Sequence, residues 1–509
     1  MRPRPPASVA MLAAARTFAI SGVEAVPVAA EVDIHRGLPA FSVVGLPDAA
    51  VRESRERVRA AIANSGFDFP LQRITVSLAP SDLRKAGPGF DLAIAAAILV
   101  ASDQIESRVL SEWTLAGELG LDGGVKPVRG ALAMAERARR DEAPGIVLPE
   151  GNAPEAALIP GIEVAPIGSL RALHALAAGA DPAPLERPLR VDLDEPASLP
   201  DLVDLRGQPA LRYALEVAAA GGHSLLIVGP PGAGKSLAAR RLPSILPPLT
   251  HAEAIEVRRI AGVAGIAMPG EAIACRPFRA PHHTVSPAGL VGGGSPPRPG
   301  EITLAHRGVL FLDELPEFAR SSVEALRQPL ECGTVEIARA SGRITLPCSF
   351  QLVAAANPCP CGRGGAAAGC RCAPAQLERY ANRISGALAD RIDLLVSVSQ
   401  PEPGSLAGDQ PEPSRRVRER VVAAREIQRA RYGDATNASA SDAELRRAAR
   451  PEPPALEALE RAQRVHGLSG RGWTRTLRLA RTCADLDGTE RIGADHVATA
   501  LSLRSRSGS

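Results

Sequence analysis

The sequence lacks any apolar run of the length that a membrane-spanning helix needs, which is about 18 residues without charges. The longest candidate, Leu92 to Ser102, is short enough to form a helix inside a protein core. We therefore expect a protein without a membrane span. The sequence also has little net charge, +3, so its overall charge does not indicate whether nucleic acid is a partner.

Lysine is scarce, because only three of the 59 basic residues are lysines and the rest are arginines. Together with abundant alanine, glycine and proline, this bias is typical of a GC-rich genome, so arginine richness alone does not indicate DNA binding. Eight cysteines in 509 residues are too few for a disulfide scaffold, which favours free thiols or a metal site. The chain length suits about three domains.

One of the three lysines, Lys235, lies in a G-x-x-x-x-G-K-S stretch, the pattern of a phosphate-binding loop. The apolar run Leu225–Val228 before it predicts a buried strand, and the residues after it predict a helix that ends at Pro243. Glycines let backbone N–H groups close around phosphate oxygens at the positive end of that helix. Because lysine is so rare, a chance glycine-rich turn is the weaker alternative. We predict that ATP contacts Gly229, Pro230, Pro231, Gly232, Ala233, Gly234, Lys235 and Ser236.

Two further strand ends complete the predicted ATP site. Lys235 would reach the β- and γ-phosphates, and the hydroxyl of Ser236 would bind Mg²⁺. The apolar run Val309–Leu312 ends at Asp313, which would hold Mg²⁺ through water, and Glu314, which would deprotonate the attacking water. The alternative for these two residues is a solvated acidic turn after a buried strand. A second apolar strand ends at Asn357, whose amide could sense the γ-phosphate.

Two arginines outside the loop indicate a ring. Arg391 lies where ring-forming ATPases carry an arginine finger that reaches a neighbouring subunit's site. Its alternative is a salt bridge with Asp390 or Asp393. Arg475 begins a helix and would be a second sensor arginine, unless it also serves only a structural role. Fingers that act between subunits imply a closed homo-oligomer.

Several longer motifs carry a family resemblance. The stretches His306–Phe318, Arg279–Thr284 and Pro299–Ile302 resemble magnesium-chelatase-like AAA+ ATPases, and with the N-terminal part they resemble the ComM/YifB branch. The resemblance implies an α/β fold, with a five-stranded P-loop AAA+ core and a helical lid. It also implies hexameric, ATP-driven DNA motors that branch-migrate recombination intermediates, some of them linked to natural competence.

The N-terminal part resembles the proteolytic domain of Lon proteases, an α+β fold like domain 2 of ribosomal protein S5. Short β-like runs, among them Phe41–Val44 and Ile74–Leu78, alternate there with helical runs. The nucleophilic serine of Lon would fall at Gly89 and its general-base lysine near Leu132. Without a nucleophile and a base, acyl transfer has no mechanism. We therefore expect a non-catalytic domain that has a structural or partner-binding role.

Composition shifts predict where one domain ends and the next begins. We expect the Lon-like domain over residues 1–180, a linker over 181–200 and the AAA+ core over 201–401. A second linker would cover 402–414, and a helical lid would cover 415–509.

Two insertions in the core could face a central pore. Apolar strands flank an Ala-Ser-Gly turn between Val335 and Leu346, which predicts a β-hairpin. Arg339 and Arg343 near its tip could hold DNA phosphates, although a merely solvated tip is the alternative. The segment Pro281 to Pro299 would be the second insertion. No acidic or cysteine partner is near its two histidines in the sequence, so we interpret His282 and His283 as structural.

Half of the cysteines lie within fourteen positions. Cys359, Cys361, Cys370 and Cys372 form a C-x-C…C-x-C set around a glycine-rich loop that could not pack by itself. Four thiolates can close a tetrahedral shell around a structural Zn²⁺. Free or redox-active thiols remain the alternative.

These observations lead to two functional hypotheses. The first is a DNA motor that uses ATP and Mg²⁺ and acts on branched or single-stranded DNA. The second is a chelatase-like or protein-remodelling ATPase that acts on a protein partner through the N-terminal domain, although the D-x-S-x-S motif that would recruit chelatase partners is missing.

The N-terminus bears on where the protein works. Arg2 and Arg4 ahead of Met11–Ala15 weakly resemble a signal peptide. Because an ATP-dependent motor belongs where ATP is available, we instead expect a cytoplasmic protein.

Overall fold

The computed structural model describes residues 11–106, 112–181, 199–266, 275–294, 297–339, 342–364, 369–384, 391–401 and 411–504, and the single positions 268, 388 and 404. Most of the predicted first linker and most of the second lie outside the described residues, so both linkers stay predictions. In the part that is described, no helix is long and apolar enough to cross a membrane.

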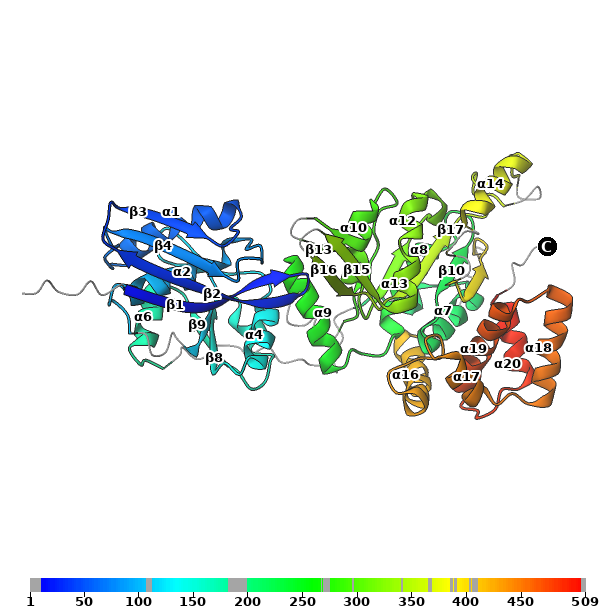
Figure 1. The fold of residues 1–509 in the computed structure, drawn as a ribbon. Coiled ribbons are helices and arrows are strands. Elements are labelled where there is room, and N and C mark those ends of the chain that lie inside the picture. Colours follow the sequence, from blue (N-terminus) through cyan, green and yellow to red (C-terminus); the bar gives the residue numbers. More distant parts are fainter. Residues whose placement is uncertain are drawn as a thin grey trace, which may run out of the picture.

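The N-terminal part is built on a seven-stranded mixed sheet in the order β3-β4-β2-β1-β5-β8-β9 (Figure 1). The longest strands, β1 and β2, form an antiparallel hairpin at its centre, where sequence analysis recognised only short runs. Met11–Ala15 is therefore part of a central strand. The strands are β1 (Met11–Ser21), β2 (Glu24–His35), β3 (Ala40–Val44), β4 (Arg73–Ala79), β5 (Thr114–Leu115), β8 (Gly145–Pro149) and β9 (Glu163–Ile167), with a separate pair, β6 (Glu118–Leu119) and β7 (Val125–Lys126).

Helices cover both faces of this sheet. Successive side chains of a strand point to opposite faces, so in β1 Ala19 joins the core cluster of α1, α2 and α6 while Phe18 joins that of α4. The apolar run after Phe90 forms a helix that is buried on nearly all sides, as predicted. The helices are α1 (Ala49–Asn64), η1 (Pro88–Phe90), α2 (Asp91–Ala101), α4 (Ala131–Arg140), α5 (Ala153–Ala156) and α6 (Leu170–Ala177).

A second, five-stranded sheet has the order β11-β14-β17-β10-β18, and every pair in it is parallel. Its four longer strands are mostly apolar, as expected for a sheet that helices cover on both faces. The predicted α/β P-loop AAA+ core is confirmed. The strands are β10 (Leu225–Val228), β11 (Phe278–Arg279), β14 (Val309–Leu312), β17 (Gln351–Ala356) and β18 (Leu394–Ser397).

The connections of the core carry its helices and two small hairpins. The predicted hairpin is observed as β15 (Thr334–Arg339) and β16 (Gly342–Pro347), and its two turn residues lie outside the described part. The other pair is β12 (Gly292–Gly293) and β13 (Arg298–Pro299). The helices are η2 (Leu202–Asp204), α7 (Pro209–Gly221), α8 (Lys235–Ile245), α9 (His251–Ala264), α10 (Pro287–Val291), α11 (Glu301–Leu304), η4 (Leu315–Glu317), α12 (Arg320–Glu324), α13 (Arg327–Cys332) and α14 (Pro374–Ile384).

The C-terminal part is a bundle of helices, as expected of a lid: α16 (Ser414–Tyr432), α17 (Asp442–Ala449), α18 (Pro453–His466), α19 (Gly470–Leu486) and α20 (Ala494–Ser502). Two expected helix boundaries were wrong. α8 continues past Pro243 to Ile245. Arg475 does not begin a helix but lies in the second turn of α19, because the Ser469 side chain caps the helix at the backbone N–H of Gly472.

The N-terminal domain docks on the AAA+ core through the tip of the β1–β2 hairpin. Val23 at this tip is 2% exposed and joins a core cluster with residues of β15 and β16. The backbone of Gly22 lies against the side chain of Ile344. Beside it, α4 packs on α9, where Arg259 Nη1 lies 2.9 Å from Glu136 Oε2. Figure 1 shows the long hairpin reaching α9 and β16.

Val23→Asp should undock the two domains. It would bury an unpaired carboxylate in an apolar contact, so we expect a loss of about 3 kcal/mol in stability. Thermal unfolding and limited proteolysis of the chain between the domains would measure the effect. Leu12→Asp, at a β1 position that is 73% exposed, is the matched control and should change little. Equal behaviour of the two variants would contradict the docking role of Val23.

Candidate functional site

The predicted phosphate-binding loop joins the carboxyl end of β10 to the start of α8. Gly234 has φ +86°, a left-handed conformation that favours glycine, and it caps the N-terminus of the helix. Gly229 donates its backbone N–H to Ala356 O at 3.1 Å, which fastens the loop to the neighbouring strand β17. The loop therefore presents a helix N-terminus, where anions are favoured.

Lys235 lies over this loop. Its Nζ donates to Gly229 O at 2.7 Å, to Pro230 O at 3.0 Å and to Asn357 Oδ1 at 3.0 Å. Burial lowers the pKa of Lys235, and the nearby carboxylates of Asp313 and Glu314 oppose this shift. The structure thus brings Asn357 and Lys235, which are 122 positions apart, to the same place above the loop.

The two carboxylates lie at the end of β14, beside the loop. The Ser236 hydroxyl donates to Asp313 Oδ2 at 2.6 Å, so the two expected Mg²⁺ ligands are adjacent. Asp313 Oδ1 accepts the backbone N–H of Glu314 at 3.0 Å. Glu314 itself has φ +52°, and its side chain is 57% exposed. The Glu314 carboxylate therefore stays accessible to water, as a general base must.

His283 is a site residue that sequence analysis missed. Its Nδ1 lies 3.7 Å from Glu314 Oε2, and its ring packs against that of His282 at 4.1 Å between centroids. The expectation that no acidic partner is near these histidines is therefore wrong. The only signal in the sequence was their position just after β11, because β11 pairs with β14.

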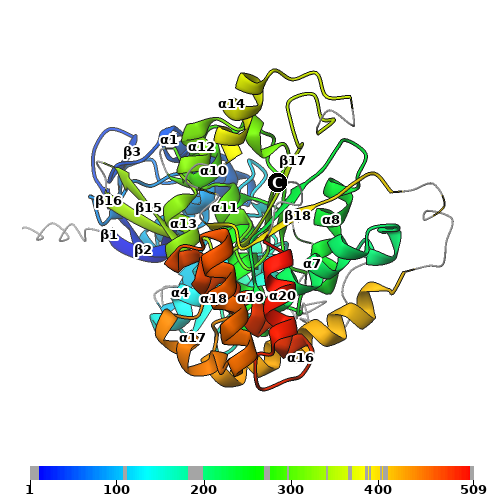
Figure 2. The same ribbon diagram turned by 90° about the vertical axis from the view of Figure 1, so that its right-hand side faces the viewer.

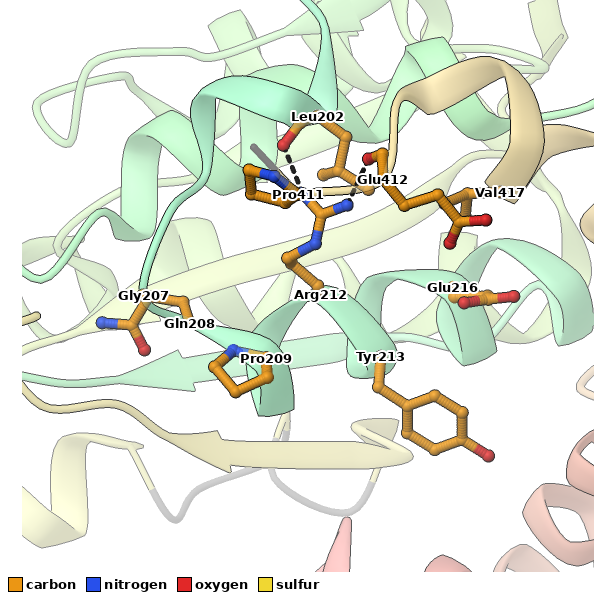
Figure 3. A pocket seen from close by; sticks show the side chains of 10 residues that line it. All are labelled: Leu202, Gly207, Gln208, Pro209, Arg212, Tyr213, Glu216, Pro411, Glu412 and Val417. Atoms are coloured by element: carbon orange, nitrogen blue, oxygen red, sulfur yellow. Dashed lines mark hydrogen bonds between the residues drawn. The ribbon is translucent and has the colours of Figure 1, made fainter. Parts of the chain in front are cut away.

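A cavity of about 320 Å³ adjoins the phosphate loop (Figure 3). One wall is the start of α7. Gln208 Nε2 donates to Ala233 O of the loop at 3.3 Å and to Ser399 O at 2.6 Å. In Figure 3, Arg212 points toward the backbone oxygens of Leu202 and Glu412, to which it donates. Gln208 therefore joins one wall of the cavity to the phosphate loop.

The two predicted catalytic arginines lie at the other edge of the sheet. The Arg391 carbonyl accepts from Ser224 Oγ at 2.6 Å, just before β10 starts, and its guanidinium pairs with Glu331. Arg475 Nε lies 4.0 Å from Asp393 Oδ1, just before β18 starts. These are the amino ends of β10 and β18, whereas the phosphate loop follows the carboxyl end of β10. The structure thus does not bring Arg391 or Arg475 to the nucleotide site of the same chain.

The four predicted metal-binding cysteines converge. Their sulfur atoms all lie within 4.8 Å of one another, with 3.3 Å between Cys359 and Cys361 and 3.5 Å between Cys361 and Cys370. Tetrahedral Zn²⁺ with Zn–S bonds of about 2.3 Å requires about 3.8 Å between sulfurs. Gly364 also donates its backbone N–H to Cys359 Sγ at 3.3 Å, a bond that would orient a thiolate ligand. The residues therefore fit a closed Cys₄ site.

A parallel sheet, a phosphate loop after β10 and acidic residues after β14, with β17 between these two strands, define the class, a P-loop ATPase of the AAA+ type. Family comparison agrees over most of the chain. Residues 201–406 match the magnesium chelatase subunit ChlI family, residues 30–152 match the family described as subunit ChlI of Mg-chelatase, and residues 411–504 match the C-terminal region of magnesium chelatase subunit ChlI.

Full-length relatives narrow the assignment. The competence protein ComM of Haemophilus influenzae is 42% identical over 97% of both chains, and the uncharacterized protein YifB of Escherichia coli is 43% identical over 97% of both. An uncharacterized protein of Mycobacterium tuberculosis is 45% identical over 97% of this chain and 98% of its own. The chain belongs to the ComM/YifB family of magnesium-chelatase-like AAA+ proteins.

Lys235→Ala and Glu314→Gln should separate binding from hydrolysis. Without the Lys235 ammonium, we expect the affinity for ATP to fall at least about tenfold and turnover to become unmeasurable. A loss of this size is expected when a partly buried charged contact with the phosphates is removed. Glu314→Gln should still bind ATP but lose about 10²–10⁴-fold in kcat, because the general base is gone. Binding of a fluorescent ATP analogue and phosphate release would be measured.

Lys126→Ala is the control for these variants, because Lys126 is exposed on the N-terminal domain. If Lys235→Ala hydrolysed ATP as fast as Lys126→Ala, the assignment of the phosphate loop would be wrong.

Proposed function

We propose that the protein is a ring-forming, Mg²⁺- and ATP-dependent DNA motor that remodels branched or partly single-stranded recombination intermediates. The observation that carries this proposal is the β15–β16 hairpin. It leads within a few residues into β17, the strand that ends beside Asn357. A change at the γ-phosphate therefore has a short, rigid connection to the hairpin.

The charge near the hairpin tip supports DNA as the partner. Arg339 pairs with Gly342 in the last register position that is described, and Arg343 pairs with Ala338 next to it. The Arg343 side chain is exposed. An exposed Arg343, with Arg339 close to it in the paired strand, suits contacts with phosphates, which position a protein on DNA without reading its bases.

The location of the arginines supports a ring. β10 is four residues long and spans about 13 Å between its two edges, with the phosphate loop at one edge and Arg391 near the other. We propose that Arg391 and Arg475 stabilise the transferred phosphoryl group of a neighbouring subunit, which requires a closed ring such as a hexamer.

In the chain's own site, Ser236 and Asp313 would hold Mg²⁺, Glu314 would take the proton from water and Asn357 would place that water.

The name of one relative supports a role in DNA uptake. The Haemophilus influenzae relative is called a competence protein, which suggests natural transformation as the setting for this chain too.

Gly89 has no side chain and Leu132 is fully buried, so neither position supplies the nucleophile or base of a protease. The Lon-like domain would serve instead as a docking module, since it contacts the hairpin strands through Val23.

We also propose that Cys359, Cys361, Cys370 and Cys372 hold a structural Zn²⁺. Four sulfurs at these separations would fill the tetrahedral shell and leave no open position for catalysis. The metal would supply folding energy to a glycine-rich loop that has few apolar contacts.

Arg339→Ala/Arg343→Ala should remove DNA stimulation of ATP hydrolysis while leaving basal turnover unchanged. We expect the parent to hydrolyse ATP several-fold faster with a four-way junction or single strands. Losing two phosphate contacts should also reduce the slope of log affinity against log salt by about 1.4 on single strands. Phosphate release and a salt titration of DNA binding are the measurements.

Arg415→Ala/Arg464→Ala is the matched control, because both arginines are exposed on lid helices. Equal basal and DNA-stimulated rates in the parent would refute the DNA role. Stimulation by an unfolded protein instead would favour the protein-remodelling alternative.

A further inference from the structure

We infer that the four-cysteine site positions the ATP site, so that a bound Zn²⁺ sets both the affinity for ATP and the rate of its hydrolysis. This inference rests on the proposed zinc site and on the proposed ATPase function. It assigns to the metal a role beyond folding its own loop.

The first connection runs through the chain to Asn357. Cys359 follows this residue by two positions and is 1% exposed. The Gly362 backbone N–H donates to Cys359 O at 2.9 Å, which turns the chain sharply at this end of the loop. A metal bound to Cys359 would therefore fasten the loop directly to the carboxyl end of β17. The same metal would therefore also fix the position of Asn357, whose side-chain oxygen accepts from Lys235.

The second connection is a direct contact with the phosphate loop. Gly362 has φ +81°, and a Cβ added there would lie 2.9 Å from Pro231 Cδ, so the cysteine loop rests on this proline. On its other side, Gln400 Nε2 donates to Pro231 O at 3.0 Å. Pro231 is thus held between the cysteine loop and the segment after β18. Loosening the cysteine loop would release one side of the phosphate loop.

The third connection runs through α14, which follows Cys372 directly. This helix is exposed along most of its length, and Figure 1 and Figure 2 both show it apart from the lid helices. Its buried contact is Tyr380, which joins the core cluster of β14 and β17. Arg383 Nη1 donates to Pro316 O at 3.3 Å, in the turn just after Glu314. The metal site therefore fastens a helix that backs the general base.

In the described part of the cysteine loop, few side chains are buried. Among its described residues only Cys359 and Gly362 are buried, and the remainder are exposed or half-buried. Glycine-rich backbone loses much conformational entropy when it is ordered, and few apolar contacts here offset that loss. Cross-linking four side chains through one ion supplies the missing constraint. The N-terminal sheet and the lid do not depend on it, because their cores lie elsewhere.

The test compares two double variants at the same positions. Cys361→Ser/Cys372→Ser removes two ligands, whereas Cys361→His/Cys372→His keeps a set of four that Zn²⁺ accepts. Cys361 is exposed and Cys372 half-buried, so histidine can be accommodated. Cys332→Ser, at an exposed cysteine outside the cluster, is the control. Zinc per chain, affinity for a fluorescent ATP analogue, kcat and melting temperature are measured on the full-length protein.

We expect one Zn²⁺ per chain in the parent, the control and the histidine variant, and none in the serine variant. The serine variant should bind the analogue about tenfold more weakly, because its loop adopts the binding conformation only part of the time. Its kcat should fall about 100-fold, as when a single stabilising contact in an active site is lost. The histidine variant should recover most of the affinity for the analogue and most of kcat.

Each failure has a distinct signature. A parent that hydrolyses ATP but takes up no Zn²⁺ would refute the zinc site, and with it this inference. A parent that binds Zn²⁺ but neither binds nor hydrolyses ATP would refute the proposed function. A serine variant that loses Zn²⁺ yet keeps the parent's affinity and kcat would overturn the inference alone. If the serine variant does not fold, rescue by the histidine variant and chelation of Zn²⁺ from the parent make the same comparison.

Discussion

The parallel pairing of β10 between β17 and β18 is the constraint on which the site depends. In a parallel sheet all carboxyl ends meet at one edge, so residues that follow different strands are brought together there. This is why Lys235, Asp313 and Asn357 converge although they come from distant parts of the chain. The same geometry sends Arg391 and Arg475 to the opposite edge, and this separation is the reason for proposing that they act on a neighbouring subunit.

Mechanical coupling follows from what is attached to β17. One end of this strand continues from the β15–β16 hairpin, and the other ends at Asn357, beside the cysteine loop. The hairpin is in turn braced by Val23 from the N-terminal domain. A single strand thus joins the proposed DNA contact, the nucleotide and the proposed metal site. In this arrangement, the N-terminal domain supports the hairpin of the AAA+ core through the contact of Val23.

In the core, buried apolar strands and the polar residues beyond their ends have different roles. The apolar strands provide the rigidity, since their side chains are almost completely buried on both faces. The site residues lie just beyond the strand ends, where burial decreases and side chains such as Glu314 reach solvent. His283 also lies just beyond a strand end, and its contact with Glu314 joins the segment after β11 to the predicted general base.

The sequence by itself determined the class of fold, and it predicted the residues of the nucleotide site. The phosphate loop, Asp313, Glu314 and Asn357 each follow an apolar run. Such patterns can be recognised in the sequence because they depend only on residues that are neighbours in the chain. Tertiary structure decided the rest. It made Met11–Ser21 a central strand, put His283 beside Glu314 and Arg475 beside Asp393, and laid Gly362 on Pro231. These outcomes depend on contacts between residues far apart in the chain, which no local pattern encodes.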